Sequence, residues 1–224
     1  PKEEVALSAY DISLNSINVV HSRLPEINGN DLVVSVKENQ FSLSDIDFRG
    51  RYRPTPLGSG ETSPHATIMA TLIAGGGNSF YTGKGAAWGA TLTTSSFASL
   101  LPDADADYRQ FNISVQNHSY GTAIENYYGA DAAAYDATVI SNPALLHVFS
   151  AGNSGNETSA SGKYSGISSM ANLTGSFKMA KNILTVAALD SFAIVAPLSS
   201  KGPAYDGRIK PELVAFDFLA VDGT

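Results

Sequence analysis

The sequence contains no cysteine, which excludes disulfide bonds, thiolate nucleophiles and thiolate metal ligands. No run of about 18 consecutive apolar residues occurs, so no membrane span is expected. Basic residues are scarce: 14 lysines and arginines stand against 21 acidic residues, and the formal charge of −7 argues against nucleic acid as a partner. The apolar fraction of 43% in 224 residues instead predicts a globular chain with one sizeable core.

Short apolar runs alternate along the chain with segments of helical character. Buried strands are expected at 31–36, 90–97, 113–119, 145–150 and 183–188, and helices at 14–24, 64–74 and 126–140. This alternation indicates a mostly parallel sheet with helices on both faces. No repeat or linker interrupts the pattern, so a single α/β domain over 1–224 is predicted.

Two motifs suggest ligand sites but fail on spacing. In the stretch GNSFYTGKG, five residues rather than four separate Gly77 from Gly83, and Gly85 stands where a phosphate-binding loop has Ser or Thr. We therefore expect a flexible loop there. The stretch DADAD at 103–107 resembles the start of a calcium loop, but Tyr108 replaces the turn glycine and Ser114 the final Glu. It is interpreted as a solvated acidic turn. No histidine pair has metal-ligand spacing, so no metal site is assigned.

The stretch SAGNSG at 150–155 ends an apolar strand with unusual hydrogen-bonding capacity. Ser154 superficially fits a nucleophile elbow, but Asn156 occupies the position of the second glycine. The elbow fold also places its histidine after the serine, and all four histidines of this chain precede Ser154. Ser154 is therefore rejected as a nucleophile.

Six blocks of sequence together resemble, in order, those of the subtilisin-like serine proteases, the subtilases. The blocks are VVSVKENQFSLSDIDFRGR (33–51), HATIMATLIAG (65–75), GKGAAWGATL (83–92), VQNHSYG (115–121), FSAGNSG (149–155) and LSSKGPAYDGRIKPELVAF (198–216). The resemblance implies a three-layer subtilisin-like α/β domain that hydrolyses peptide bonds through an acyl-enzyme.

The resemblance also assigns the base and its partner. His65 is the expected general base, since a serine hydroxyl becomes nucleophilic only when an imidazole takes its proton. The family's orienting Asp aligns with Glu38, which has the same charge and is one methylene longer. The alternatives are that Asp45 or Asp47 takes this duty, or that the triad has been lost.

The remaining site residues also follow from the resemblance. Asn153 matches the side-chain donor of the oxyanion hole, which stabilises charge that develops during reaction. Two backbone segments are expected to pair with an extended polypeptide substrate and to line its first side-chain subsite; they comprise Ser119, Tyr120, Gly121, Ala151 and Gly152.

The family's catalytic serine follows Gly-Thr, and this chain ends at Gly223-Thr224. The serine is therefore expected beyond Thr224, so the domain lacks its C-terminal part, and a C-terminal fragment that carries this serine is an expected partner. The resemblance implies no required cofactor, export to a secreted or periplasmic location, and calcium sites for which no ligand set is assignable. Two rival hypotheses are a catalytically inactive subtilase-fold module that binds peptides or proteins, and a nucleotide-binding protein, which the failed glycine-loop spacing disfavours.

Overall fold

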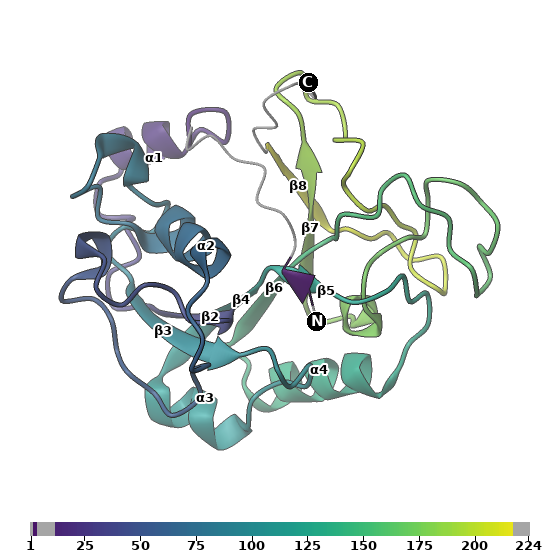
Figure 1. Ribbon diagram of the computed structural model, residues 1–224, viewed down its shortest axis with the longest axis horizontal. Coiled ribbons are helices and arrows are strands. Elements are labelled where there is room, and N and C mark those ends of the chain that lie inside the picture. Colours follow the sequence, from purple (N-terminus) through teal and green to yellow (C-terminus); the bar gives the residue numbers. More distant parts are fainter. Residues whose placement is uncertain (1, 4–11, 217–224) are drawn as a thin grey trace.

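The computed structural model describes residues 2–3 and 12–216 of the chain. Its central sheet has six parallel strands in the order β3-β2-β4-β6-β7-β8 (Figure 1). Their bounds are β2 (Val33–Glu38), β3 (Thr91–Ser96), β4 (Ile113–His118), β6 (Leu146–Ser150), β7 (Leu184–Leu189) and β8 (Leu213–Phe216). A separate antiparallel pair joins β1 (Lys2–Glu3) to β5 (Tyr120–Gly121).

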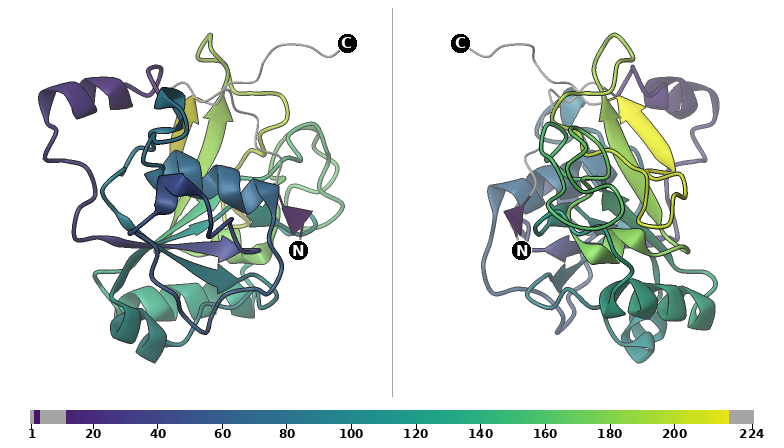
Figure 2. Two further views of the ribbon diagram at one scale, coloured as in Figure 1. Left: turned by 60° about the vertical axis from the view of Figure 1, so that its left-hand side comes forward. Right: turned by 90° about the vertical axis from the view of Figure 1, so that its right-hand side faces the viewer.

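Helices cover both faces of the sheet, which confirms the predicted fold class. They are α1 (Ile17–Arg23), α2 (Pro64–Ala74), α3 (Asp105–Phe111) and α4 (Ala130–Ser141), with short 3-10 helices η1 (Ile46–Phe48), η2 (Tyr81–Gly83) and η3 (Ser176–Met179). Helix α2 lies on one face of the sheet, whereas α3 and α4 lie on the other (Figure 2).

Helix α2 has the predicted bounds because its ends carry strong local signals. The Ser63 hydroxyl accepts hydrogen bonds from the backbone N–H groups of His65 (3.1 Å) and Ala66 (3.3 Å), and Pro64 occupies the first turn. Gly75 follows directly after the last helical residue. By contrast, helix α1 is shorter than the expected segment at 14–24 and buries none of its residues.

The interpretation of 103–107 as a solvated acidic turn is wrong. Helix α3 begins at Asp105, where two acidic residues in its first turn are favourable near the positive end of the helix dipole. Asp103 precedes it and forms a buried ion pair with Lys37, with Nζ and Oδ1 2.6 Å apart. Strand β8 was not predicted at all, and its four residues are half-buried or exposed.

The glycine-rich stretch at 77–85 connects α2 to β3, and hydrogen bonds to its backbone hold it. It contains η2, and Asp47 Oδ1 accepts hydrogen bonds from the backbone N–H groups of Asn78 and Ser79, the latter at 3.1 Å. The carboxylate of Asp47 thus holds the segment through its backbone N–H groups.

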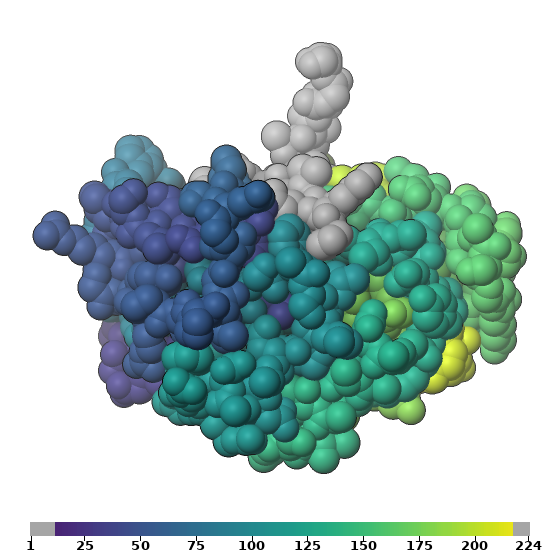
Figure 3. All heavy atoms as spheres, turned by 60° about the horizontal axis from the view of Figure 1, so that its bottom comes forward, coloured from purple at the N-terminus to yellow at the C-terminus, as the bar shows by residue number. Residues whose placement is uncertain are grey.

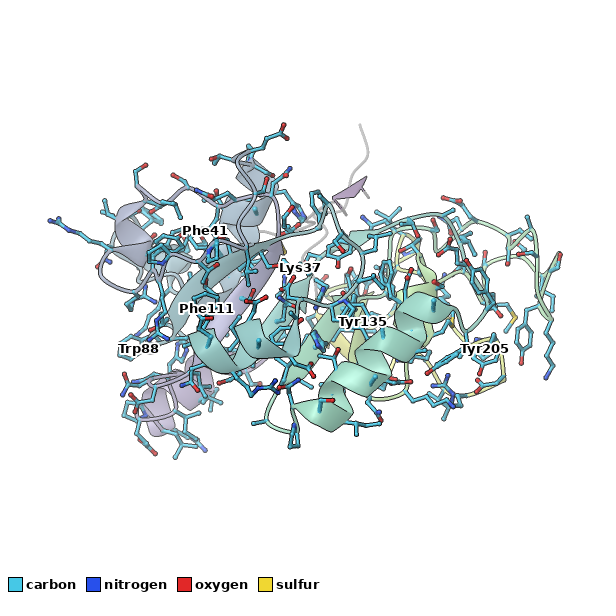
Figure 4. The ribbon with its side chains drawn as sticks, turned by 90° about the horizontal axis from the view of Figure 1, so that it is seen from below. Lys37, Phe41, Trp88, Phe111, Tyr135 and Tyr205 are labelled. Carbon is cyan, nitrogen blue, oxygen red and sulfur yellow. The ribbon has the colours of Figure 1, made fainter. Side chains whose placement is uncertain are left out.

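The two faces of β2 differ in chemistry. Toward α2, Val34 and Val36 pack in an apolar cluster with Ala66, Ala70 and Ala74. On the other face, Lys37, Ser95, Asp103, Tyr108 and Gln116 form a polar network: besides the ion pair, Gln116 Nε2 donates to Asp103 Oδ2 (2.8 Å) and Tyr108 donates to Gln116 Oε1 (2.9 Å). Lys37 and Tyr135 lie near the centre of the molecule in Figure 4.

Two buried histidines, His118 and His147, lie beneath α4, where both contact the ring of Tyr135. His118 Nε2 and His147 Nδ1 are 3.0 Å apart, and both residues are fully buried. Burial lowers the pKa of His147 to about 3 and holds the pKa of His118 well below 6.5. Segments coloured teal, which include α3 and α4, cover this side of the molecule (Figure 3).

These neutral histidines predict a loss of stability in acid. The unfolded chain takes up protons as the pH falls below about 6.5 and the folded chain does not, so the stabilisation present above pH 6.5 is lost as the pH falls toward 3. The unfolding equilibrium constant is expected to rise up to about tenfold per pH unit for each histidine. In His147→Asn, which keeps a hydrogen-bonding partner for His118, the rise between pH 7 and pH 5 is expected to shrink by about tenfold, as measured by urea unfolding. An equal rise in both proteins would contradict the prediction.

Candidate active site

The site centres on a contact between the end of β2 and the start of α2. Glu38 is the last residue of β2, and His65 is the second residue of α2. The His65 Nδ1 and Glu38 Oε1 atoms are 2.7 Å apart, and the side chains are 12% and 0% exposed. A buried carboxylate oxygen thus lies at ion-pair distance from one nitrogen of a partly accessible imidazole.

Backbone hydrogen bonds hold the two segments together. The N–H of Gln40, two residues after β2, donates to the carbonyl of Glu61 (2.7 Å), and the N–H of Ser63 donates to the carbonyl of Gln40 (2.9 Å). The hydroxyl of Ser63 then caps α2 at His65. The cap that begins the helix therefore also places His65 beside Glu38.

Neither alternative carboxylate is in this position. Asp45 Oδ1 accepts the backbone N–H of Asp47 (3.0 Å) and caps η1, and Asp47 binds the backbone at Asn78 and Ser79. Both are engaged with backbone groups around η1, whereas Glu38 contacts the imidazole.

This contact defines the chemistry available to His65. A carboxylate at Nδ1 favours the tautomer that carries its proton there, which makes Nε2 the basic nitrogen. It also stabilises the imidazolium once Nε2 has taken a proton. The side chain of Glu38, one methylene longer than that of an aspartate, reaches the imidazole directly from the end of β2.

The loop after β6 is held from two sides. The Ala151 N–H donates to the carbonyl of Val186 (2.8 Å), and the Ala151 carbonyl accepts a hydrogen bond from the N–H of Thr174 (3.4 Å). The Ser200 N–H donates to the Gly152 carbonyl (2.8 Å). These bonds fix the backbone immediately before Asn153, whose half-buried side chain is the predicted oxyanion donor.

Gly152 is required at its position in this loop. Its φ of +114° is in the region that favours glycine, and a Cβ there would meet the Thr174 hydroxyl, its methyl group (2.8 Å) and Ser200 Oγ (2.9 Å). The Ser154 N–H donates to Ser200 Oγ (3.0 Å), and the Ser154 hydroxyl donates to Glu157 (3.0 Å). Ser154 thus has structural partners on the surface side of the loop.

The predicted substrate segment at 119–121 already pairs with an extended strand. Lys2 lies opposite Gly121 and Glu3 opposite Tyr120, in antiparallel register. The Tyr120 side chain is fully buried, and its hydroxyl lies 3.0 Å from His118 Nδ1. Tyr120 therefore offers its backbone to a peptide, and its side chain belongs to the core. Ser119 is half-buried and accepts a hydrogen bond from Asn117 (3.0 Å).

The topology of the sheet brings Glu38, Ser119 and the loop at 151–153 to one edge. Strand β2 lies between β3 and β4, so the chain reverses its direction across the sheet at this point. In open parallel sheets such a switch point is where ligands bind, at the carboxyl ends of the strands. Glu38, Ser119 and the 151–153 loop all lie at this edge. The position after Gly223-Thr224, where the serine is expected, lies outside the described residues.

Two residues that hold the site were missed from the sequence: Ser63 and Thr174. Ser63 had a usable signal, since a serine directly before Pro is a helix-start pattern. Thr174 had none, because its place beside Gly152 results from a contact between distant segments. Within residues 2–3 and 12–216, no three His, Asp or Glu side chains gather as metal ligands.

The fold is an α/β fold of the subtilisin type, with a parallel sheet and helices on both faces. The carboxylate–histidine contact lies at the carboxyl edge of this sheet. A model of the subtilase family matches residues 29–216, so the chain belongs to the subtilase family. No helix in the described part of the chain has the length and apolar character of a membrane span.

Solved structures of proteases share the fold. The prenylagaramide maturation protease PagA has a TM-score of 0.63 and 17% identity, over 90% of this chain and 66% of that one. The patellamide maturation protease PatA has a TM-score of 0.59 and 17% identity, over 84% and 66%. The serine protease of Aeromonas sobria has a TM-score of 0.57 and 20% identity, over 78% and 35%. The chain thus spans only part of each of these proteins.

The close packing at Gly152 predicts a large effect of a single methyl group. Gly152→Ala is expected to lower the free energy of unfolding by more than about 2 kcal/mol, because it adds strain at positive φ and a collision with Thr174. Gly60→Ala is the matched control: nothing lies within 4 Å of its added methyl group, and a change within about 0.5 kcal/mol is expected. Urea unfolding of both variants measures the difference, and equal values would refute the packing argument.

Proposed function

We propose that this subtilase chain supplies the base, the orienting carboxylate and the oxyanion donor of a serine endopeptidase. The observation that carries the proposal is the 2.7 Å contact between His65 Nδ1 and the buried carboxylate of Glu38. Membership of the subtilase family supports a serine-type peptidase in general terms. The assignment of individual roles rests on the geometry of the site.

In the proposed reaction, His65 Nε2 takes the proton of the attacking serine hydroxyl and later gives it to the leaving amine. Glu38 keeps the imidazole in the required tautomer and stabilises its cationic form without taking the proton. Attack forms a bond from the serine oxygen to the carbonyl carbon, and collapse of the intermediate breaks the peptide bond and leaves an acyl-enzyme. Water then hydrolyses this ester with His65 again as base.

Asn153 is the proposed side-chain donor to the oxyanion. The negative charge on the carbonyl oxygen exists only during reaction, so a donor held in advance lowers the barrier without a cost of reorganisation. The hydrogen bonds of Ala151 and Gly152 to neighbouring segments hold the backbone before Asn153 in place.

The proposed substrate is an extended polypeptide that adds to the edge of β5 as a strand, in the way that β1 does. We place the serine nucleophile beyond Thr224, on the same chain or on a C-terminal fragment that associates with it. A required cofactor is not part of the proposal, and export to a secreted or periplasmic location remains an expectation from family resemblance. Calcium ligands are not assigned.

A second candidate is a catalytically inactive module that binds extended peptides. The pairing of β1 with β5 supports it, since this edge accepts a strand whether or not chemistry follows. A fluorophosphonate probe, which labels an activated serine covalently, separates the two on the intact encoded protein. Labelling supports the peptidase, and its absence from a correctly folded protein supports the binding module.

Substitutions of Glu38 test the carboxylate–histidine unit. Glu38→Gln keeps the size of the side chain but removes its charge, and the rate of labelling is expected to fall by about 10⁴-fold. Glu38→Asp withdraws the carboxylate by roughly 1.5 Å and is expected to give an intermediate loss. His65→Ala is expected to abolish labelling, whereas Glu26→Gln, at an exposed position, leaves the rate at the wild-type value. A wild-type rate in Glu38→Gln would contradict the assignment.

Substitution of Asn153 tests the oxyanion donor. Asn153→Ala is expected to lower kcat for peptide hydrolysis by about 10²- to 10³-fold, the loss found on removing such a donor from a subtilisin. Little change in KM is expected, because the hydrogen bond is made chiefly in the transition state. Ser154→Ala is the matched control one residue later, and it is expected to retain activity because its hydroxyl binds Glu157. Reversed effects of the two substitutions would restore Ser154 as a catalytic candidate.

A further inference from the structure

The backbone and the side chain of Ser200 bracket the proposed oxyanion donor. The Ser200 N–H donates to the carbonyl of Gly152 (2.8 Å), and the Ser200 hydroxyl accepts a hydrogen bond from the N–H of Ser154 (3.0 Å). Gly152 and Ser154 are the residues directly before and after Asn153. Ser200 therefore holds both ends of the short backbone segment that carries the Asn153 side chain.

Ser200 is itself held from both sides of the chain. The hydroxyl of the preceding residue, Ser199, accepts a hydrogen bond from the N–H of Ala188 (3.0 Å), which attaches the segment to β7. The N–H of the following residue, Lys201, donates to Asn172 Oδ1 (2.7 Å), and the Asn172 N–H donates to the carbonyl of Lys201 (3.0 Å). These anchors fix Ser200 relative to the sheet, so its hydroxyl is a fixed point for the loop.

The contact between Ser200 and the loop is closely packed. Ser200 is fully buried, and a Cβ on Gly152 would lie 2.9 Å from Ser200 Oγ. Removal of the hydroxyl would therefore leave the Ser154 N–H without this acceptor at a place where water has little room to replace it. A backbone N–H that loses a buried partner shifts toward another one, and Asn153 would move with it.

An oxyanion donor is sensitive to such a shift. The donor must lie about 2.7–3.1 Å from the position that the oxyanion occupies, and a displacement of about 1 Å can cost about 100-fold in rate. We propose that Ser200 is a positioning residue, whose hydroxyl fixes the backbone at Ser154 and thereby holds Asn153 at the oxyanion position. This role rests on the proposed peptidase function, in which Asn153 is the donor.

Substitutions of Ser200 in the intact encoded protein test the proposal. In Ser200→Ala the limiting rate of fluorophosphonate labelling is expected to fall by about 5- to 30-fold, because one lost hydrogen bond displaces the donor without removing it. Asn153→Ala sets the upper limit of this loss, at about 10²- to 10³-fold. The probe concentration that gives half the limiting rate is expected to change by less than about twofold, because the donor acts chiefly in the transition state. Ser200→Cys, whose sulfur is a weak acceptor, is a second variant with a smaller expected loss.

Two comparisons separate positioning from a general loss of stability. Ser199→Ala is the matched control, since it also removes a buried hydroxyl that accepts a backbone N–H, but that N–H belongs to Ala188 on β7. Its labelling rate is expected to stay within about twofold of the wild-type rate, although urea unfolding is expected to show both variants destabilised. The double variant Asn153→Ala/Ser200→Ala is expected to match Asn153→Ala within about twofold, because Ser200 acts through Asn153.

The outcomes separate this proposal from the peptidase function. An equal loss in Ser199→Ala, or losses that multiply in the double variant, overturns the role of Ser200 and leaves the peptidase function intact. A wild-type rate in Asn153→Ala overturns the proposed oxyanion donor instead. If the wild-type protein is not labelled, the peptidase function fails, and the hold of Ser200 on the loop is measured by hydrogen exchange with mass spectrometry of peptides that span 150–156. Faster exchange in Ser200→Ala than in Ser199→Ala supports that hold, and equal exchange overturns it.

Discussion

Strand β2 ends in two fully buried charges, Lys37 and Glu38, that point to opposite faces of the sheet. Burial of a charge costs several kcal/mol unless a partner compensates it, so both faces must provide one. Asp103, ahead of α3, pairs with Lys37, and His65, on α2, contacts Glu38. Because the two residues are adjacent in one rigid strand, the segments that carry Asp103 and His65 are fixed relative to each other at the carboxyl edge of the sheet.

The loop at 150–155 shows how the same edge acquires its polarity. Its backbone groups form hydrogen bonds with Thr174, Val186 and Ser200, and Gly152 is confined between Thr174 and Ser200. Most of the hydrogen-bonding capacity that marks this stretch therefore serves to hold a backbone in an unusual conformation. Asn153 is the member of the loop proposed to act on a reacting group, and its usefulness depends on the rigidity that the other residues provide.

The sequence was most informative where structure is determined locally. The bounds of α2 were predictable because Ser63, Pro64 and Gly75 act within one turn of the helix ends, and the parallel sheet followed from short apolar runs. Prediction failed where distant segments meet. The first turn of α3 was misread because the same aspartates suit a solvated turn, and nothing local pairs Asp103 with Lys37. Tyr120 was expected to offer its backbone to a substrate, and no local signal indicated that its side chain packs beside His118 in the core.

Two of the buried lysines are held in ion pairs. Lys37 pairs with Asp103 beneath the sheet, and Lys210 pairs with Glu212 (2.6 Å) near Thr185, at the amino end of β7. Both pairs stabilise the fold, whereas the antiparallel pairing of β1 with β5 shows an edge to which an extended strand adds. Backbone hydrogen bonds at that edge accept any peptide, since every residue carries the same amide group. Any selection among peptides must therefore come from the side chains that surround this edge.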